Sequence, residues 1–154
     1  MERWESYLPL MELAQLNIIH YGLHRHEQFA ATERTFNHYG VSYMSKGSSL
    51  VRFAEETLEL HAGDAFRIPP GVQPDHIKTG EGVAEFLWWD FRFDVAGCVD
   101  ALKPFRLPRK VHMDDQTQFA QLFSEFMRFM EHPKSPSDLL LLKARAMELM
   151  SMIL

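Results

Sequence analysis

The sequence has little of what secreted, membrane-spanning or nucleic-acid-binding proteins require. Its one cysteine, Cys98, cannot form a disulfide within the chain, which fits the reducing cytoplasm. No apolar run approaches the ~20 residues that cross a bilayer, and the first residues lack the basic end and apolar stretch of a signal peptide. The formal net charge of -5 leaves no excess of Lys and Arg for a large nucleic-acid surface. These features predict a cytoplasmic protein and indicate that this chain itself contacts neither a membrane nor DNA.

The first two thirds of the sequence carry short segments of alternating polar and apolar residues, separated by Gly, Pro and charged turns. A chain of 154 residues, 46% hydrophobic and 24% charged, fits one globular domain. The predicted strands span residues 37–45, 50–54, 57–61, 65–68 and 85–93. Short strands at this spacing are typical of an all-β barrel or sandwich.

The segment 85–93 is apolar on both of its faces. Phe86 and Trp88 share one face, and Leu87, Trp89 and Phe91 share the other. A strand with one solvated face would show polar residues on that side, so one face is predicted to line the barrel interior and the other to lie under helices. Cys98 follows in an apolar stretch, which predicts a buried thiol.

Two helices are predicted after residue 113. Asp114 or Asp115 is a candidate N-cap for the first, which carries a single apolar stripe beginning at Phe119. Ser137 or Asp138 is a candidate cap for the second, which runs from about Leu139 to the end of the chain.

The second helix has two apolar stripes, more than one core contact requires. One stripe holds Leu142, Ala146, Leu149 and Ile153. The neighbouring stripe is the predicted dimer interface, made of Leu139, Leu140, Lys143, Met147 and Met150. Since the apolar pattern continues to Leu154 without a capping Gly, the natural protein is expected to extend further.

The most specific string is Gly63-Asp64-Ala65-Phe66-Arg67-Ile68-Pro69-Pro70-Gly71, of the form G-x5-P-x-G, which suits tight corners of a β-barrel. It is preceded by Tyr43 to Gly47 and followed by Trp88 to Phe91 and the two helices. This order over residues 34–154 resembles the sensor domain of AraC-family transcription regulators.

The resemblance implies a mostly-β, cupin-like (jelly-roll) barrel followed by two C-terminal α-helices. Residues 1–113 would form the effector-binding barrel with an N-terminal arm, and residues 114–154 the dimerisation segment of the same domain. The family also implies a small polar effector, often a sugar, and a C-terminal DNA-binding domain. That last domain is absent from this chain. The expected protein is therefore a homodimeric regulator and not an enzyme.

Candidate ligand-binding residues follow from strand parity. On the first strand of the matched region one side carries Arg34, Phe36 and His38, and on the last strand one side carries Phe86 and Trp88. His76, just past the Pro-Pro-Gly corner, is placed at the barrel mouth. The resemblance implies that Trp88 stacks on a sugar ring, and an indole with a flat face and one N–H donor suits a polyol. These residues are predicted to bind the effector: Arg34, Phe36, His38, His76, Phe86 and Trp88.

Two alternatives remain. A metal-dependent cupin enzyme would need ligands near positions 34–36, 40 and 74, which hold no ligand pair, while His24, His26 and His76 are displaced from that spacing. No metal and no cofactor are therefore predicted, and His24 and His26 are interpreted as solvated or lightly packed. The second alternative is a dimerisation module without a ligand, whose interior is packed solid by Phe36, Phe86 and Trp88.

Overall fold

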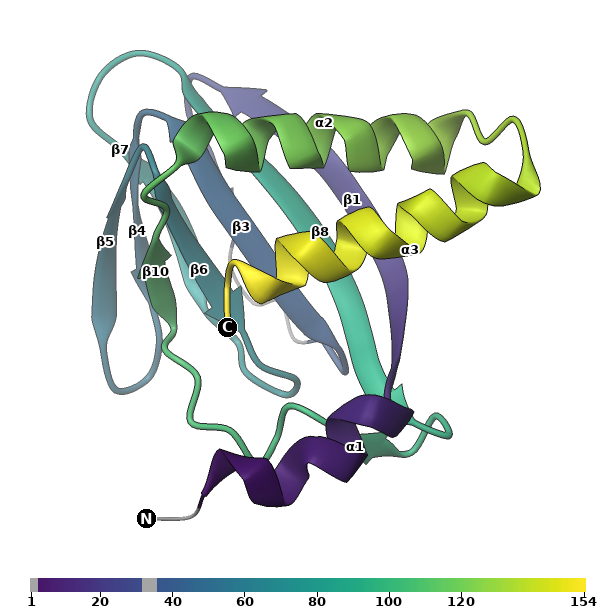
Figure 1. The fold of residues 1–154 in the computed structure, drawn as a ribbon. Helices are drawn as coiled ribbons and strands as arrows, with labels where there is room; N and C mark the ends of the chain where they lie inside the picture. Colours follow the sequence, from purple (N-terminus) through teal and green to yellow (C-terminus); the bar gives the residue numbers. More distant parts are fainter. Residues whose placement is uncertain (1–2, 32–35) are drawn as a thin grey trace.

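A computed structural model describes residues 3–31 and 36–154, and its strands form two facing sheets (Figure 1). Arg34 lies outside the described residues. Sheet A has the order β1-β8-β3-β6-β10, with β9 paired to β8, and sheet B has the order β2-β7-β4-β5. The strands of sheet A are β1 (Gln15–His26), β3 (Tyr39–Lys46), β6 (Asp64–Ile68), β8 (Ala84–Val95), β9 (Val99–Asp100) and β10 (Lys110–His112). Those of sheet B are β2 (Ala30–Ala31), β4 (Ser48–Arg52), β5 (Thr57–His61) and β7 (Asp75–Thr79).

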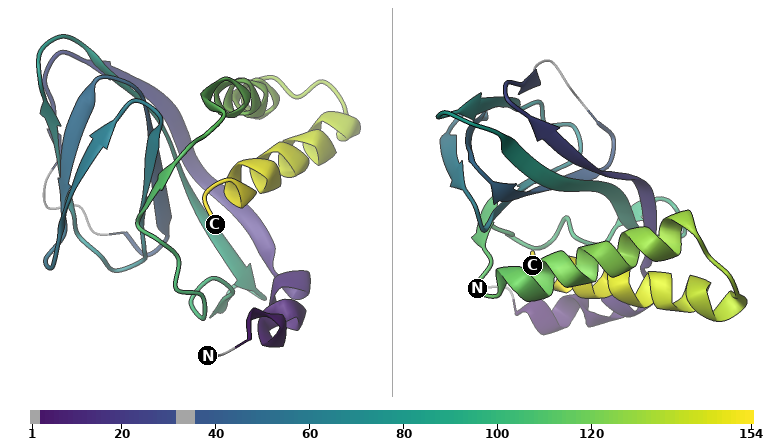
Figure 2. Two further views of the ribbon diagram at one scale, coloured as in Figure 1. Left: turned by 60° about the vertical axis from the view of Figure 1, so that its left-hand side comes forward. Right: turned by 90° about the horizontal axis from the view of Figure 1, so that it is seen from above.

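Helices cover the outer face of sheet A, and sheet B faces its inner side (Figure 2). The helices are α2 (Gln116–Glu131) and α3 (Pro136–Ser151). Within the described residues, no strand pairing joins sheet A to sheet B, so the barrel is open rather than closed by hydrogen bonds. The predicted mostly-β fold with two C-terminal helices is confirmed.

The long strand β8 divides the hydrophobic core into two parts. Its outward residues Trp89 and Phe91 are buried with the helices, and the Trp89 ring lies 5.9 Å from Phe119 and 5.6 Å from Phe123. Its inward residues Phe86 and Trp88 belong to a second cluster between the sheets. The prediction that one face of this strand lines the interior and the other lies under the helices is confirmed.

The two helices begin at local capping signals. Asp115 is the N-cap of α2, and its side chain accepts a hydrogen bond from the Gln118 backbone N–H. For α3 the predicted caps were two to three residues too late. Ser135 accepts from the Asp138 backbone N–H, and Pro136 occupies the first turn, where its missing N–H costs nothing.

Residues 4–26 form elements that the strand pattern did not predict. A 3-10 helix η1 (Trp4–Tyr7) and a short helix α1 (Leu8–Leu13) precede β1. The Tyr7 ring packs edge-on against Phe105 at 5.4 Å, and Leu10 and Met11 pack against the core under α2 and α3. This arm therefore lies on the helix side of sheet A and not over the inner face.

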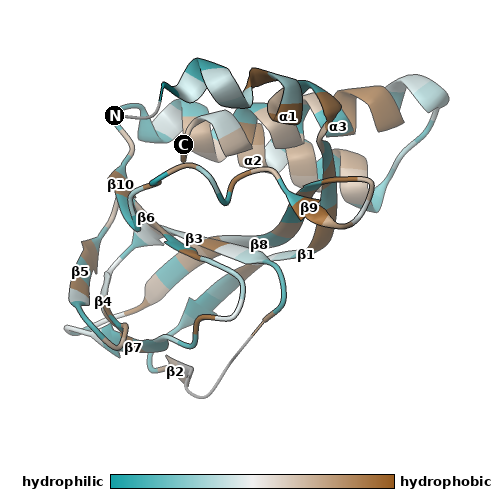
Figure 3. Cartoon of the chain, turned by 90° about the horizontal axis from the view of Figure 1, so that it is seen from below, coloured by the Kyte–Doolittle hydropathy of each residue, from teal (hydrophilic) through white to brown (hydrophobic). Residues whose placement is uncertain are grey.

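Hydropathy along the chain shows brown, apolar segments on α3 (Figure 3). In the described part of the chain, none of the helices is both long and apolar enough to span a membrane. Cys98 is exposed, contrary to the prediction, because it sits in the turn between β8 and β9 rather than in a strand.

Candidate functional site

A cavity of about 220 Å³ lies between the two sheets. Its apolar wall comes from the inner face of β8, from β6 and from the segments before β2 and β3. These apolar side chains are Phe29, Phe36, Phe66, Ile68, Phe86 and Trp88. The polar groups on the wall are few, namely His24, His26, Ser42, His76 and Asp90. A concave, mostly apolar site with a few polar groups is the form that small-molecule sites take.

One side of the cavity is a stack of aromatic rings contributed by β1 and β8. The His24 ring stacks on Phe86 at 5.2 Å, on Trp88 at 5.4 Å and on His26 at 5.4 Å. His24 Nδ1 and His26 Nε2 are 3.2 Å apart. Antiparallel pairing produces this stack, because His24 lies opposite Phe86 and Gly22 opposite Trp88.

Trp88 has room because its neighbour on β1 is a glycine. A Cβ at Gly22 would come within 2.9 Å of Trp88 Nε1. The indole N–H is buried and has no hydrogen-bond partner among the residues that the structure describes. An unpaired buried donor costs about 1–3 kcal/mol, so an acceptor supplied by a guest would be favoured there.

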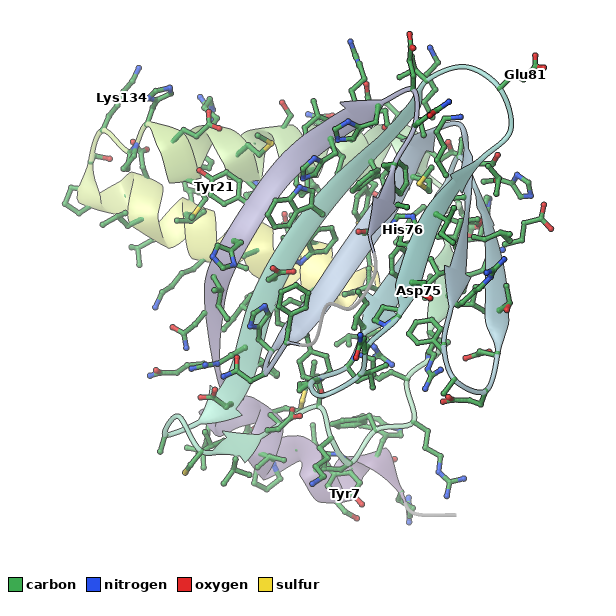
Figure 4. All side chains as sticks on the ribbon, turned by 180° about the vertical axis from the view of Figure 1, so that it is seen from behind. Tyr7, Tyr21, Asp75, His76, Glu81 and Lys134 are labelled. Atoms are coloured by element: carbon green, nitrogen blue, oxygen red, sulfur yellow. The ribbon has the colours of Figure 1, made fainter. Side chains whose placement is uncertain are left out.

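His76 lies on β7 and projects between the sheets (Figure 4). It is 7% exposed, is hydrogen-bonded through Nε2 to Ser49 Oγ at 2.8 Å, and is packed edge-on against Phe29 and Phe66. Burial lowers the pKa of His76 to about 4 from an ordinary value of 6.5. The side chain is therefore a neutral hydrogen-bonding group at physiological pH, inside the cavity rather than at its mouth.

Asp90 is the acidic group on the cavity wall. Burial raises the pKa of its carboxyl, and the nearby His38 and His20 rings partly offset that effect. Its carboxylate lies 3.4 Å from His38 Nε2 and 3.5 Å from His20 Nδ1. The cavity thus combines a neutral histidine with a carboxyl group that is held between two further histidines.

Comparison with known proteins places this architecture in a family. The family model of the AraC-like ligand binding domain matches residues 17–150. The chain belongs to the AraC-like ligand binding domain family. The cupin-like fold class predicted from the sequence is confirmed. No curated protein sequence matches the chain.

Solved structures similar to this AraC-like domain share little sequence with it. The EutQ protein of Clostridium difficile is 15% identical, with 51% of this chain and 67% of that chain covered and a TM-score of 0.37. A predicted oxalate decarboxylase of Thermotoga maritima is 12% identical, with 62% and 76% covered and a TM-score of 0.44. The cupin domain of Cnp3 from Schizosaccharomyces pombe is 9% identical, with 57% and 64% covered and a TM-score of 0.43.

Four of the six candidate ligand residues come together in the AraC-like domain. Phe36, His76, Phe86 and Trp88 all line the cavity. His38 does not line it but sits behind Phe36, with the ring centroids 5.0 Å apart. The cavity residues that the sequence interpretation left out include the polar side chains His24, His26, Ser42 and Asp90 and the apolar side chains Phe29, Phe66 and Ile68.

His24 and His26 could have been found by extending the parity argument to β1. They alternate with Leu23 and Arg25, and the pairing of His24 with Phe86 places both histidines on the same face of sheet A as Phe86. These two histidines were interpreted as solvated or lightly packed; His26 is exposed, and His24 is half-buried in the aromatic stack.

Four of the five α3 residues predicted for dimerisation are exposed, and the fifth is buried. Leu139, Leu140 and Met147 are 52%, 71% and 43% exposed, and Lys143 is also exposed. Lys143 and Met147 border a groove between α3 and β1. Met150 does not belong to the exposed surface of α3, contrary to its place in the predicted interface. It is 3% exposed and packs in the core beside Leu149, because α3 turns this position toward sheet A.

Proposed function

We propose that this domain senses a small molecule in the cavity between its sheets and dimerises through α3, as part of a cytoplasmic AraC-type transcription regulator without enzymatic activity. DNA binding would then come from a further domain outside these residues. The observation that carries the proposal is the cavity lined by Phe36, His76, Phe86 and Trp88 in a member of a ligand-binding family.

The size of the cavity limits the effector. A volume of about 220 Å³ equals roughly seven water volumes of ~30 Å³. Sites for drug-sized ligands measure ~300–1,000 Å³, so a compact metabolite fits better than a large one. This room also disfavours the ligand-free alternative, which requires an interior packed solid.

The chemistry of the walls favours a molecule with one flat apolar face and a few polar groups. The Trp88, Phe86 and His24 rings offer stacking surfaces, and His76, Ser42 and Asp90 offer hydrogen bonds. Monosaccharides and small ring-containing acids both have this character.

A thermal-shift screen over monosaccharides and small carboxylic acids tests the sensor function. A ligand present at 100 times its Kd stabilises the native state by ~2.7 kcal/mol, which for a domain of this size raises Tm by about 5–10 °C. Trp88→Ala should abolish that shift. The matched control is Trp4→Ala, since Trp4 is 61% exposed and lies outside the cavity. An equal shift in Trp88→Ala, or no shift with any compound, would contradict the proposal.

Dimerisation is tested on the exposed part of α3. In a two-fold interface each substitution acts twice, and losing two buried Leu side chains costs about 3 kcal/mol or more. Leu140→Asp should therefore weaken the dimer at least about 100-fold in sedimentation equilibrium. The control is Leu13→Asp on α1, which is comparably exposed at 67%. A wild-type monomer, or a dimer that tolerates Leu140→Asp, would refute dimerisation through this face.

A further inference from the structure

Three potential metal ligands from separate segments converge beside the cavity. They are His20 on β1, His38 just before β3 and Asp90 on β8, and one ligand atom from each lies within 4.8 Å of the others. Asp90 Oδ2 lies 3.5 Å from His20 Nδ1 and 3.4 Å from His38 Nε2. Among the described residues, these three are the His, Cys, Asp or Glu side chains whose ligand atoms lie close enough together to hold one metal ion.

A β-bulge brings His20 to this group. The register pairs Ile18 with Phe91 and then His20 with Asp90, so Ile19 is the extra residue. Without the bulge, His20 would lie opposite Trp89 and face the helices, since Ile18 packs in the outer core. Bulges re-aim side chains in this way next to functional sites.

A glycine makes room for the carboxylate. Gly40 pairs with Asp90 across β3 and β8, and a Cβ at Gly40 would lie 3.2 Å from Asp90 Oδ1. The absence of a side chain at this position lets the Asp90 carboxylate lie flat against β3, within reach of His38.

The His38 ring presents an unused nitrogen to that carboxylate. It is 7% exposed, and its Nε2 atom is buried with no hydrogen-bond partner within residues 3–31 and 36–154. Its Nδ1 atom lies 3.2 Å from Asn37 Oδ1, an acceptor that selects the tautomer with the proton on Nδ1. In that tautomer the Nε2 lone pair faces a carboxylate oxygen 3.4 Å away, and either a proton or a metal ion between the two atoms would stabilise this arrangement. An outer hydrogen bond that orients the ring is also what metal-binding histidines have.

We propose that His20, His38 and Asp90 bind one divalent transition-metal ion, such as Zn²⁺ or Fe²⁺. Bonds of about 2.0–2.1 Å place tetrahedral ligands about 3.3 Å apart, close to the two distances to Asp90. Two imidazoles and one carboxylate leave coordination positions open. Asp90 also lines the cavity, so the ion would adjoin the effector site.

This site differs from the two metal-ligand sets that the sequence analysis considered and rejected. A cupin enzyme pattern would use positions 34–36, 40 and 74, and the other histidine set was His24, His26 and His76. His76 is instead hydrogen-bonded to Ser49, and the possible ligands that converge among the described residues are the three named here. The sequence predicted no metal because the bulge that aligns His20 with Asp90 is invisible in the pattern.

Zn²⁺ and Co²⁺ titrations of EDTA-treated, dialysed protein test the site. One equivalent of Co²⁺ should give the visible absorption of a ligand-field band, and Zn²⁺ should displace it. His20→Ala and Asp90→Asn should each weaken Zn²⁺ binding at least about 100-fold. The His20 side chain is 61% exposed, so His20→Ala should fold like the wild type even if Asp90→Asn does not.

His61→Ala is the matched control, because His61 is equally exposed at 62% and also pairs with a carboxylate, Glu59, at 3.2 Å. It should bind Zn²⁺ as the wild type does. Failure of the wild type to bind either ion stoichiometrically would overturn the proposal. So would binding that survives His20→Ala and is lost in His24→Ala, since the ion would then sit on the cavity pair.

Discussion

The buried His76 should make the stability of the domain depend on pH in a way that one substitution removes. Its pKa is about 4 in the folded protein and about 6.5 in the unfolded chain. Because the folded value is the lower one, the unfolded state binds the proton first as pH falls. The stabilisation is therefore complete above pH 6.5 and is lost as pH falls toward 4.

The magnitude follows from the two pKa values. Each pH unit between them costs about 1.4 kcal/mol, so lowering the pH from 7 to 5 should reduce the free energy of unfolding by about 2 kcal/mol through this group alone. His76→Gln keeps a hydrogen-bonding group near Ser49 but cannot titrate. Urea unfolding of both proteins at pH 7 and pH 5 isolates the effect, because His24, His26 and Asp90 on the same wall are present in both.

The expected result is a decrease in stability that is about 2 kcal/mol larger for the wild type than for His76→Gln. His61→Ala, which removes an exposed histidine, should keep the wild-type pH dependence. Identical pH dependence in the wild type and His76→Gln would refute the reasoning, since it would mean that His76 is accessible to protons in the native state.

Two further predictions concern local structure. Gly47→Ala should lower the free energy of unfolding by at least ~1 kcal/mol more than Gly82→Ala. Both glycines have positive φ, but a Cβ at Gly47 would come within 2.9 Å of the Ala84 backbone, while one at Gly82 would meet nothing within 4 Å. Equal losses in urea unfolding would disprove this packing. Asp115→Ala should cost about 1 kcal/mol through loss of the α2 cap. Asp114→Ala should cost little, and the reverse order would mean that the cap is misassigned.

The strands with an unbroken period of two were predictable from the sequence. Residues 57–61 were predicted and form β5, and the strand around Trp88 is longer than predicted by a residue or two at each end. β1 was missed because its bulge at Ile19 shifts the alternation by one residue partway along, so no single parity runs through it. β7 was missed because five residues beginning with Asp75-His76 carry too little apolar alternation to stand out.

The candidate site was predictable where it depends on β8 and not where it depends on β1. Phe86 and Trp88 follow from the parity of a strongly apolar strand. Asp90 has the same parity on β8 and could have been added to them. His24 joins them only through the pairing of β1 with β8, a contact between residues more than sixty positions apart. On α3 the error at Met150 has a similar origin, because a stripe on a helical wheel does not show at which angle the helix crosses the sheet.

One route from the cavity to the helices runs through β8. Trp88 faces the cavity, while its chain neighbour Trp89 contacts Phe119 and Phe123 on α2. A guest that fills the cavity without moving this strand would raise Tm and regulate nothing, because regulation needs different affinities for two arrangements of the helices. By linkage, if each protomer's effector binds the dimer more tightly than the monomer by some factor, two bound effectors strengthen the α3-mediated dimer by the square of that factor. Effector affinity measured in the wild type and in Leu140→Asp therefore separates a sensor from a domain that only holds its ligand.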